Sequence, residues 1–279
     1  RDVVRRQFGK QAARWEQYLS YLDSQDVVEW ISGHLELRPH FSVLDVATGT
    51  GLLARAIAPH VHSVVGLDAT PEMLDAGRKQ ARADVLGNVV FEEGEAEHLP
   101  YPDEAFDLVT SRIAMHHFPD PLGPAREMAR VCRPGGHVAI IDITSSDNAE
   151  VAAAHNRLER LRDPSHARSM HIAELRQMAE ATGLDTVRTS VADVEVHVET
   201  WMDLTDTPQD ARVTIRQAME ADLAGGAQNC AIGILAAVMG ARQSGEGCWV
   251  DVAMLDGALA LQSMALATHP QHGNSQPRG

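Results

Sequence analysis

The chain has 279 residues, of which 44% are hydrophobic, and this is enough to bury the core of one large domain or two small ones. Acidic residues outnumber lysine plus arginine by 39 to 24, which gives a formal net charge of −15. No basic cluster is present for a nucleic acid or an anionic membrane surface, so neither is expected as a partner. We expect no signal peptide, no membrane span and, with three cysteines that lack C-x-x-C spacing, a cytoplasmic protein.

The N-terminal region carries two stretches of helical periodicity, Val3–Tyr18 and Gln25–Leu35. Pro39 then marks a break in the chain before the first predicted strand. The periodicity alone predicts amphipathic helices and assigns them no particular role.

The stretch Val43–Leu53 organises the rest of the sequence. Val43–Ala47 has the composition of a buried strand with one acid, Thr48–Gly51 gives a tight turn, and helical spacing begins at Leu52. Such a turn presents backbone N–H groups at a helix N-terminus, and its glycines let a ligand approach the backbone. An ordinary strand-to-helix turn has the same pattern, and so does a dinucleotide loop of the loose G-x-G-x-x-G/A type.

Asp45 argues against the dinucleotide interpretation. A carboxylate before the glycines would repel a pyrophosphate, whereas it is complementary to an ammonium or sulfonium cation. The sequence DVATGTG resembles the first motif of class I S-adenosylmethionine-dependent methyltransferases, and alanine at position 47 also occurs in their ubiquinone/menaquinone-biosynthesis branch. The resemblance implies S-adenosylmethionine as the cofactor, bound by Asp45, Ala47, Gly49 and Gly51. It also implies that RRQFGKQAARW, in the first helix, folds over the cofactor as a lid.

The second strand, Ser63–Asp68, ends in an acid about 20 residues beyond the glycine turn, where nucleotide-binding folds present a carboxylate to ribose hydroxyls. Two hydroxyls can donate to one carboxylate, so an acid suits this position. The resemblance implies that Asp68 and Ala69 bind the cofactor and that Met73 faces its adenine. A methionine of the hydrophobic core would produce the same pattern at position 73.

The third strand, Asn88–Glu93, leads into a segment that resembles the family pattern G-D-A-x-x-L-P-F-x-D-x-x-F-D. The resemblance implies that the acid after the glycine, here Glu95 with its neighbour Ala96, accepts a hydrogen bond from the adenine amino group. Glu95 is one methylene longer than the family's usual aspartate, which changes the reach of this contact.

The fourth strand, Phe106–Ser111, ends at the crevice where open α/β sheets bind ligands. The resemblance implies that Arg112 binds the carboxylate of the methionine moiety. His116-His117 resembles the family's frequent L-H-H, and two interpretations remain open. His117 acts as a general base for a substrate hydroxyl or acidic carbon, or the pair is a structural feature of the loop. No histidine pair has convergent partners at metal-ligand spacing, so no metal site is predicted.

A fifth strand is expected at His137–Ile143, after a helix over Pro121–Val131 and a turn at Arg133–Gly136. Strands that alternate with helices in this way predict an α/β fold. We expect a Rossmann-like, doubly wound and mainly parallel sheet with helices on both faces.

Two further helical patterns, Glu150–Arg162 and Ala173–Ala181, would roof the substrate pocket. Between them, RDPSH at Arg162–His166 resembles a loop of the same methyltransferase branch, and it is either a polar turn or a contact loop. Alternation over Thr186–Val198 predicts a sixth strand.

The last fifth of the chain resembles a different family. DLAGG, CAIGILAA and GEGCWVDVAMLDG resemble the middle of family III CoA-transferases, with the α-methylacyl-CoA racemase branch closest. Asp222 matches the active-site aspartate of that branch, but the region of its histidine partner is methyltransferase here. We predict a helix over Ala227–Ala241 and a strand at Cys248–Leu255, which would take the antiparallel position beside the fifth strand.

The sequence therefore predicts a methyltransferase domain at residues 1–221 and a partial CoA-transferase family III-like segment at residues 222–279, the latter a helical and strand appendage. The predicted activity is methyl transfer from S-adenosylmethionine to the oxygen, carbon or nitrogen of a small-molecule acceptor. An acyl-CoA racemase or CoA-transferase fragment and a non-catalytic, nucleotide-binding remnant of a fusion remain as alternatives.

Overall fold

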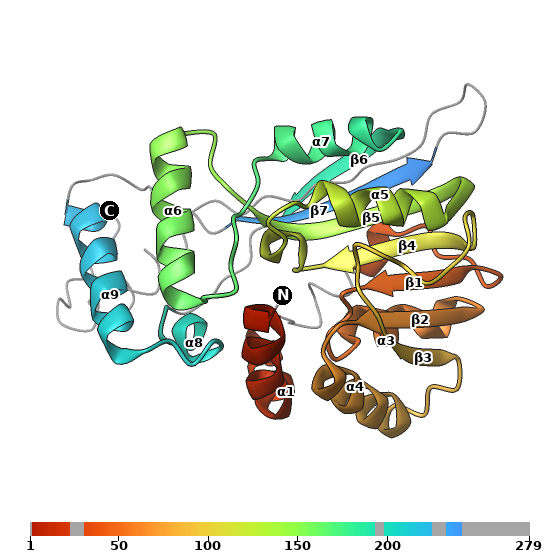
Figure 1. Cartoon of the computed structure of the whole chain (residues 1–279), viewed down its shortest axis with the longest axis horizontal. Coiled ribbons are helices and arrows are strands. Elements are labelled where there is room, and N and C mark those ends of the chain that lie inside the picture. Colours follow the sequence, from red (N-terminus) through yellow and green to blue (C-terminus); the bar gives the residue numbers. More distant parts are fainter. Residues whose placement is uncertain (1, 23–30, 193–197, 225–232, 242–279) are drawn as a thin grey trace, which may run out of the picture.

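The computed structural model describes residues 2–22, 31–192, 198–224 and 233–241. Its centre is a seven-stranded sheet in the order β3-β2-β1-β4-β5-β7-β6 (Figure 1). The five parallel strands are β1 (Ser42–Val46), β2 (Ser63–Asp68), β3 (Val89–Glu93), β4 (Phe106–Arg112) and β5 (Cys132–Thr144). The predicted doubly wound, mainly parallel sheet is therefore confirmed.

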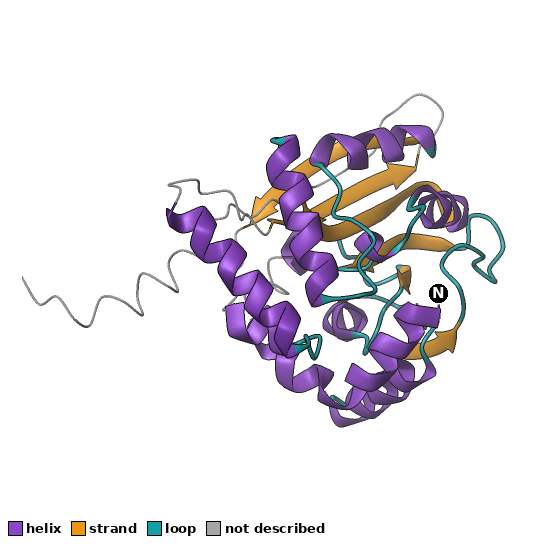
Figure 2. Ribbon diagram, turned by 60° about the vertical axis from the view of Figure 1, so that its left-hand side comes forward, coloured by secondary structure: helices purple, strands orange, loops and turns teal. Residues whose placement is uncertain are grey.

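Helices connect the strands and cover both faces of the sheet (Figure 2). They are α1 (Asp2–Leu22), α3 (Leu52–Ile57), α4 (Pro71–Ala83), α5 (Leu122–Val131), α6 (Ala149–Arg162), α7 (Ile172–Ala181), α8 (Val198–Asp203) and α9 (Gln209–Ala224). Single 3₁₀ turns lie at Ala58–His60 and Met115–His117. Parallel strands need such crossovers because a tight turn cannot join them.

The central strands are apolar on both sides because both faces of the sheet are packed. Val43 of β1 and Ile141 of β5 belong to the hydrophobic core on one face. Their chain neighbours Leu44 and Ile140 belong to the core on the other face. The continuous apolar runs in the sequence therefore reflect burial from two directions, with successive side chains pointing to opposite faces.

The predicted strand bounds hold for β2 and are wrong at two later places. β5 begins at Cys132, and the predicted turn at Arg133–Gly136 is a bulge within it, because the pairing with β4 shifts register there. β6 (Leu184–Ala192) ends before the predicted Val198, which begins α8.

The strand beside β5 is not the predicted one. β7 (Gly233–Ala241) runs antiparallel to β5 and β6, with Ile140 opposite Ala237, so the predicted helix is wrong over these residues. A short apolar run has no decisive period, and pairing on both sides satisfies backbone groups of β5 and β6 that a helix would leave bare. Cys248–Leu255 lies outside the described residues.

The helix α1 lies across the carboxyl ends of β1 and β2, and α6 and α9 lie side by side beyond them (Figure 1). The Gln7 side chain of α1 donates a hydrogen bond to the carbonyl of Thr205, 2.8 Å away, which ties α1 to the chain after α8. The carboxyl ends of the strands are thus enclosed between α1 and the end of α6.

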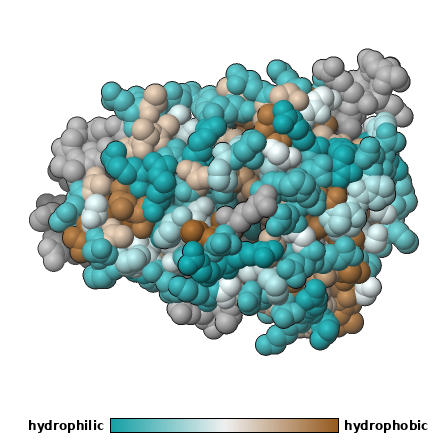
Figure 3. All heavy atoms as spheres, in the orientation of Figure 1, coloured by the Kyte–Doolittle hydropathy of each residue, from teal (hydrophilic) through white to brown (hydrophobic). Residues whose placement is uncertain are grey.

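The face seen in Figure 3 is mainly hydrophilic, with hydrophobic side chains in small separate areas. Among the described residues, the large hydrophobic side chains that are exposed are Val3, Val85, Val90 and Val213. None of the described helices is both long enough and apolar enough to cross a membrane.

We predict that proline at position 237 disrupts the sheet. Ala237→Pro removes a backbone N–H in an internal strand, where each unpaired buried group costs about 1–3 kcal/mol, so the urea midpoint of unfolding should fall. Ala237→Ser keeps the N–H and is the matched control, for which a much smaller change is expected. Equal midpoints for the proline variant and the unaltered chain would contradict the internal position of β7.

Candidate functional site

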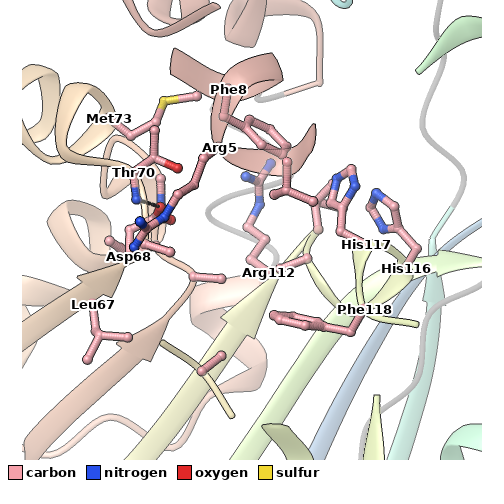
Figure 4. Close-up of a pocket in the computed structure, with 18 of the residues that line it drawn as sticks. Arg5, Phe8, Leu67, Asp68, Thr70, Met73, Arg112, His116, His117 and Phe118 are labelled. Atoms are coloured by element: carbon pink, nitrogen blue, oxygen red, sulfur yellow. Dashed lines mark hydrogen bonds between the residues drawn. The ribbon is translucent and has the colours of Figure 1, made fainter. Parts of the chain in front are cut away.

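A cavity of about 210 Å³ opens at the carboxyl ends of β1, β2 and β4 (Figure 4). Its wall comes from segments that are far apart in the sequence: α1, the loop after β1, the end of β2 with the start of α4, the segment after β3, the end of β4 with its 3₁₀ turn, and the chain after α6 and α8. These segments meet because parallel strands have their carboxyl ends at the same edge of the sheet, as the sequence predicts.

The loop after β1 has a left-handed backbone at Ala47 (φ 55°), Gly49 (φ 58°) and Gly51 (φ 74°). Ala47 is the strained position of the three, because its Cβ disfavours a conformation that glycine adopts freely. Gly49 lines the cavity, and a Cβ built on it would meet nothing within 4 Å, so the loop leaves open space for a ligand. Gly66 of β2 lets the loop pack closely against the strand, because a Cβ added at this position would lie only 2.9 Å from Cγ2 of Thr48.

Asp45 lies beneath this loop and is only 1% exposed. Its carboxylate accepts hydrogen bonds from Oγ1 of Thr48 at 2.5 Å and Oγ1 of Thr110 at 2.6 Å. Burial raises the pKa of Asp45 to about 6, against the lowering effect of the two hydroxyls. Asp45 and Gly51 are not part of the cavity wall, so they shape the loop from behind.

Asp68, at the end of β2, faces the cavity. Its two carboxylate oxygens accept the backbone N–H groups of Gly49 and Thr70, each at 2.8 Å. Burial raises the pKa of Asp68, and the two N–H groups oppose that rise. The Thr70 hydroxyl and the backbone N–H of Ala69 also interact with this carboxylate, so Asp68 joins the loop after β1 to the start of α4 in the cavity wall.

The other residues predicted at this end of the site also line the cavity, namely Ala47, Ala69, Met73, Glu95 and Ala96. Met73 is 1% exposed and belongs to the wall through the start of α4. The structure thus brings together the residues after β1, β2 and β3 that the sequence analysis proposed, with Asp45 and Gly51 behind them.

Arg112 and His117 line the opposite end, and Arg112 lies between Asp68 and His117 in Figure 4. Ile113 between them has φ 51°, which is strained for a β-branched residue, and its N–H donates to the Ile141 carbonyl at 2.7 Å. The backbone therefore turns sharply at the end of β4 and directs the 3₁₀ turn towards the cavity.

The two adjacent histidines have different surroundings. His116 is buried, its Nδ1 lies 2.5 Å from a carboxylate oxygen of Asp142, and its backbone N–H donates to the other oxygen at 3.0 Å. Burial alone would lower the pKa of His116, but the carboxylates of Asp142, Glu159 and Asp163 together raise it. The Nδ1 atom of His117 lies 3.2 Å from the carbonyl oxygen and 3.1 Å from Oγ of Ser165.

One site residue, the buried acid Asp142, was absent from the sequence prediction. The RDPSH loop was left open there as a polar turn or a contact loop, and in the structure its Ser165 contacts His117 directly and its Asp163 is a buried acid nearby. Asp142 had the same signal as Asp45, a single acid in an apolar strand. Asp163 and Ser165 belong to the RDPSH loop, where position in the fold and not local pattern reveals the contact. Among the described residues, no group of three His, Cys, Asp or Glu side chains is placed to hold a metal ion.

This arrangement has two chemically distinct ends. Asp68 and the open glycine loop can accept the hydroxyl donors of a nucleoside at one end. At the other end, a histidine ring stands beside the aromatic ring of Phe8 from α1, with 5.0 Å between the ring centres. A reacting atom between the two ends would lie under α1 and out of bulk water.

Comparison with known proteins connects this site to methyl transfer. Residues 44–140 match the family described as methyltransferase domain, and residues 177–279 match CoA-transferase family III. YcgJ of Bacillus subtilis, an uncharacterized methyltransferase, is 33% identical over 203 residues, which cover 73% of this chain and 80% of YcgJ. The demethylmenaquinone methyltransferase of Listeria welshimeri is 36% identical over 154 residues, 53% of this chain and 64% of that protein.

Solved structures agree with the sequence matches. The crystal structure of YcgJ superposes with a TM-score of 0.73 at 28% identity and covers 79% of this chain and all (100%) of YcgJ. The structure of BH2331 from Bacillus halodurans gives a TM-score of 0.66 at 31% identity, with 67% of this chain and 81% of that one covered.

We predict that Thr110→Val destabilises the fold in a pH-dependent way. The pKa of Asp45 is higher in the folded chain than its ordinary value of 3.8, so its contribution to stability is full below about pH 4 and is lost as the pH rises through 6. Loss of the Thr110 hydroxyl raises that pKa further. Thr110→Val should therefore cost more at pH 8 than at pH 5, by about 1–3 kcal/mol in urea unfolding.

Thr144→Val is the matched control, because Thr144 is buried on β5 and its hydroxyl has no hydrogen-bond partner among the described residues. Its effect should be the same at both pH values. A pH-independent cost for Thr110→Val would contradict an ionised Asp45 in the fold.

Proposed function

Because the chain belongs to the family of S-adenosylmethionine-dependent methyltransferases, we propose that its cavity holds S-adenosylmethionine and that it methylates a small-molecule acceptor. The observation that carries this proposal is the position of the Asp68 carboxylate, at the carboxyl end of β2 in the cavity wall. This is the carboxylate that the ribose hydroxyls of an adenosine cofactor require.

The remaining cofactor contacts are proposed from the wall on either side of Asp68. Gly49 gives close approach to the backbone, Met73 and Ala69 flank the adenine, and Glu95 with Ala96 receives its amino group. Asp45 and Gly51 support the loop from behind. These side chains suit a positively charged ligand that contains adenosine. Asp68 and Glu95 supply negative charge, and S-adenosylmethionine has no phosphate that this charge would repel.

Arg112 is proposed to bind the carboxylate of the methionine part of the cofactor, since a guanidinium group is complementary to a carboxylate. The Arg112 side chain also lies between Asp68 and His117, as Figure 4 shows. S-adenosylmethionine supplies a methyl group on a positively charged sulfur. His117 is proposed as the general base towards the acceptor, because it lines the cavity at the end away from Asp68.

The acceptor end is lined partly by apolar side chains, which include Phe8, Ile113 and Leu204. A small acceptor with an apolar body and a polar reacting group fits such a wall. The name of the Listeria relative makes a quinone precursor of the demethylmenaquinone type the first acceptor to test, with oxygen, carbon and nitrogen nucleophiles all included in the screen.

An acyl-CoA reaction has less support. The CoA-transferase match begins at residue 177, so it includes β6, α8, α9 and β7, and these elements complete the methyltransferase-like fold. Asp222, the residue that resembles an active-site aspartate, lies in α9 near its end.

We predict that S-adenosylhomocysteine binds the chain and that Asp68→Ala weakens this binding. Each lost charge-assisted hydrogen bond is worth about 1.5–3 kcal/mol, so calorimetry should show an affinity at least roughly tenfold lower. Asp75→Ala, on the exposed side of α4, removes the same charge outside the cavity and should bind normally.

The unfolding temperature of each variant, measured without ligand, separates lost contacts from lost structure. Transfer of labelled methyl from S-adenosylmethionine to an acceptor in the screen tests the activity itself. Tight NAD binding without S-adenosylhomocysteine binding would show the proposal to be wrong.

A further inference from the structure

The loop after α6 forms a chain of hydrogen bonds that ends on His117. Ser165 donates its hydroxyl to a carboxylate oxygen of Asp163 at 2.6 Å and its backbone N–H to the same oxygen at 2.8 Å. The hydroxyl oxygen and the carbonyl oxygen of Ser165 both lie close to Nδ1 of His117, at 3.1 and 3.2 Å. Asp163 is 3% exposed, so this chain is shielded from water.

The directions of these bonds determine the tautomer of His117. A carbonyl oxygen can only accept, and the Ser165 proton is already directed to Asp163, so Nδ1 of His117 must carry the proton that it shares with Ser165. In a neutral imidazole the other nitrogen then has a lone pair. That nitrogen, Nε2, lies on the side of the ring away from Ser165.

We propose that Asp163 and Ser165 are positioning residues that hold His117 in its Nδ1–H tautomer, with Nε2 available as a base for an acceptor whose nucleophilic atom carries a proton. This inference rests on the proposed function. The acceptor gives its proton to Nε2 as its electron pair forms the bond to the methyl carbon, and the electrons of the broken carbon–sulfur bond stay on sulfur. Hydroxyl, N–H and acidic C–H acceptors fit this requirement, whereas tertiary amines and thioethers have no need of it.

The charge around His117 agrees with such a role. Burial and the neighbouring His116 lower the pKa of His117 to about 4, so the ring is neutral at pH 7 and can accept a proton. Burial opposes ionisation of Asp163, but the charged form of His117, Arg162 and the two bonds from Ser165 hold the pKa of its carboxyl below the usual range. Its negative charge, transmitted through the Ser165 hydroxyl, stabilises the imidazolium that forms on proton transfer.

The titratable groups that act on His117 are His116 of the same 3₁₀ turn, Asp142 of β5, and Asp163 and His166 of the loop after α6. The charged groups that line the same cavity are Arg5 of α1, Arg112 of β4 and Arg162 of α6, and Glu159 of α6 acts on the neighbouring His116. Of these, Asp163 is the one joined to Nδ1 of His117 through a single hydroxyl.

Long-range ¹H–¹⁵N correlation spectra of the full chain, labelled at histidine, test the inference at pH 7. His117→Gln identifies the signals of His117. The expected result is the Nδ1–H pattern in the unaltered chain, whereas exposed histidines favour the Nε2–H form.

Two variants should then shift the ring in part to the Nε2–H form. Ser165→Ala removes one of the two acceptors of the Nδ1 proton and leaves the backbone carbonyl of residue 165 as the other. Asp163→Asn provides an amide that can donate to Oγ of Ser165, and this frees the hydroxyl proton to turn towards His117. Asp147→Asn is the matched control, since Asp147 pairs with His171 on the surface, and it should leave His117 unchanged.

An Nε2–H ring in the unaltered chain would overturn the proposal, and so would an unchanged Nδ1–H ring in both variants. Calorimetry with S-adenosylhomocysteine distinguishes this failure from failure of the proposed function. The unaltered chain and the Asp147→Asn control should bind it with the same affinity, because Asp147 lies on the surface and outside the cavity wall. Absence of binding in the unaltered chain would refute the proposed function and leave the tautomer result intact.

Discussion

The burial of one carboxylate, that of Asp45, constrains the loop on which the cavity depends. An ionised group at this depth is costly unless donors surround it, and the two that do so are hydroxyls of Thr48 and Thr110. To bring Thr48 back over the end of β1, the chain must turn sharply, and Ala47 takes a left-handed conformation in doing so. Gly49 then reaches Asp68, so that a single buried acid determines how β1 and β2 meet at the cavity.

Much of this architecture is readable from local patterns. Strands β1 to β4 are short runs bounded by turn residues, and the charged side chains at or next to their ends, acids in β1 to β3 and Arg112 in β4, differ from the apolar residues before them. Because parallel strands end at a common edge, the sequence alone assigns Asp68 and Arg112 to one site. The finer distinction, that Asp45 lies behind the loop and Asp68 in the cavity, needs three dimensions, since both are single acids at strand ends.

The elements that were predicted wrongly are those whose secondary structure depends on pairing with residues far away in the sequence. The segment Gly233–Ala241 has a composition that suits a helix or a strand, and its pairing with both β5 and β6 decides between them. For the same reason the match to CoA-transferase family III, which begins at residue 177, does not divide the fold at that point. Residues that match the CoA-transferase family therefore form the last strands of a sheet whose first strands match the methyltransferase family. This is possible because an open sheet edge pairs with any segment that offers backbone N–H and C=O groups in register.

The adjacent histidines illustrate how the same residue type acquires opposite properties within one turn. Both are withdrawn from water, which disfavours the charged ring. For His116 the carboxylate of Asp142 is in direct contact and, with those of Glu159 and Asp163, it raises the pKa against the effect of burial, and the His116–Asp142 pair fixes the turn to β5. For His117 the nearest carboxylate acts through a hydroxyl, and the charge of His116 adds to the effect of burial, so its pKa falls. The structural and the catalytic interpretations of His116-His117 therefore need not compete. The contacts of His116 suit the first, and burial together with the charge of His116 favours the neutral ring at position 117 that the second would require.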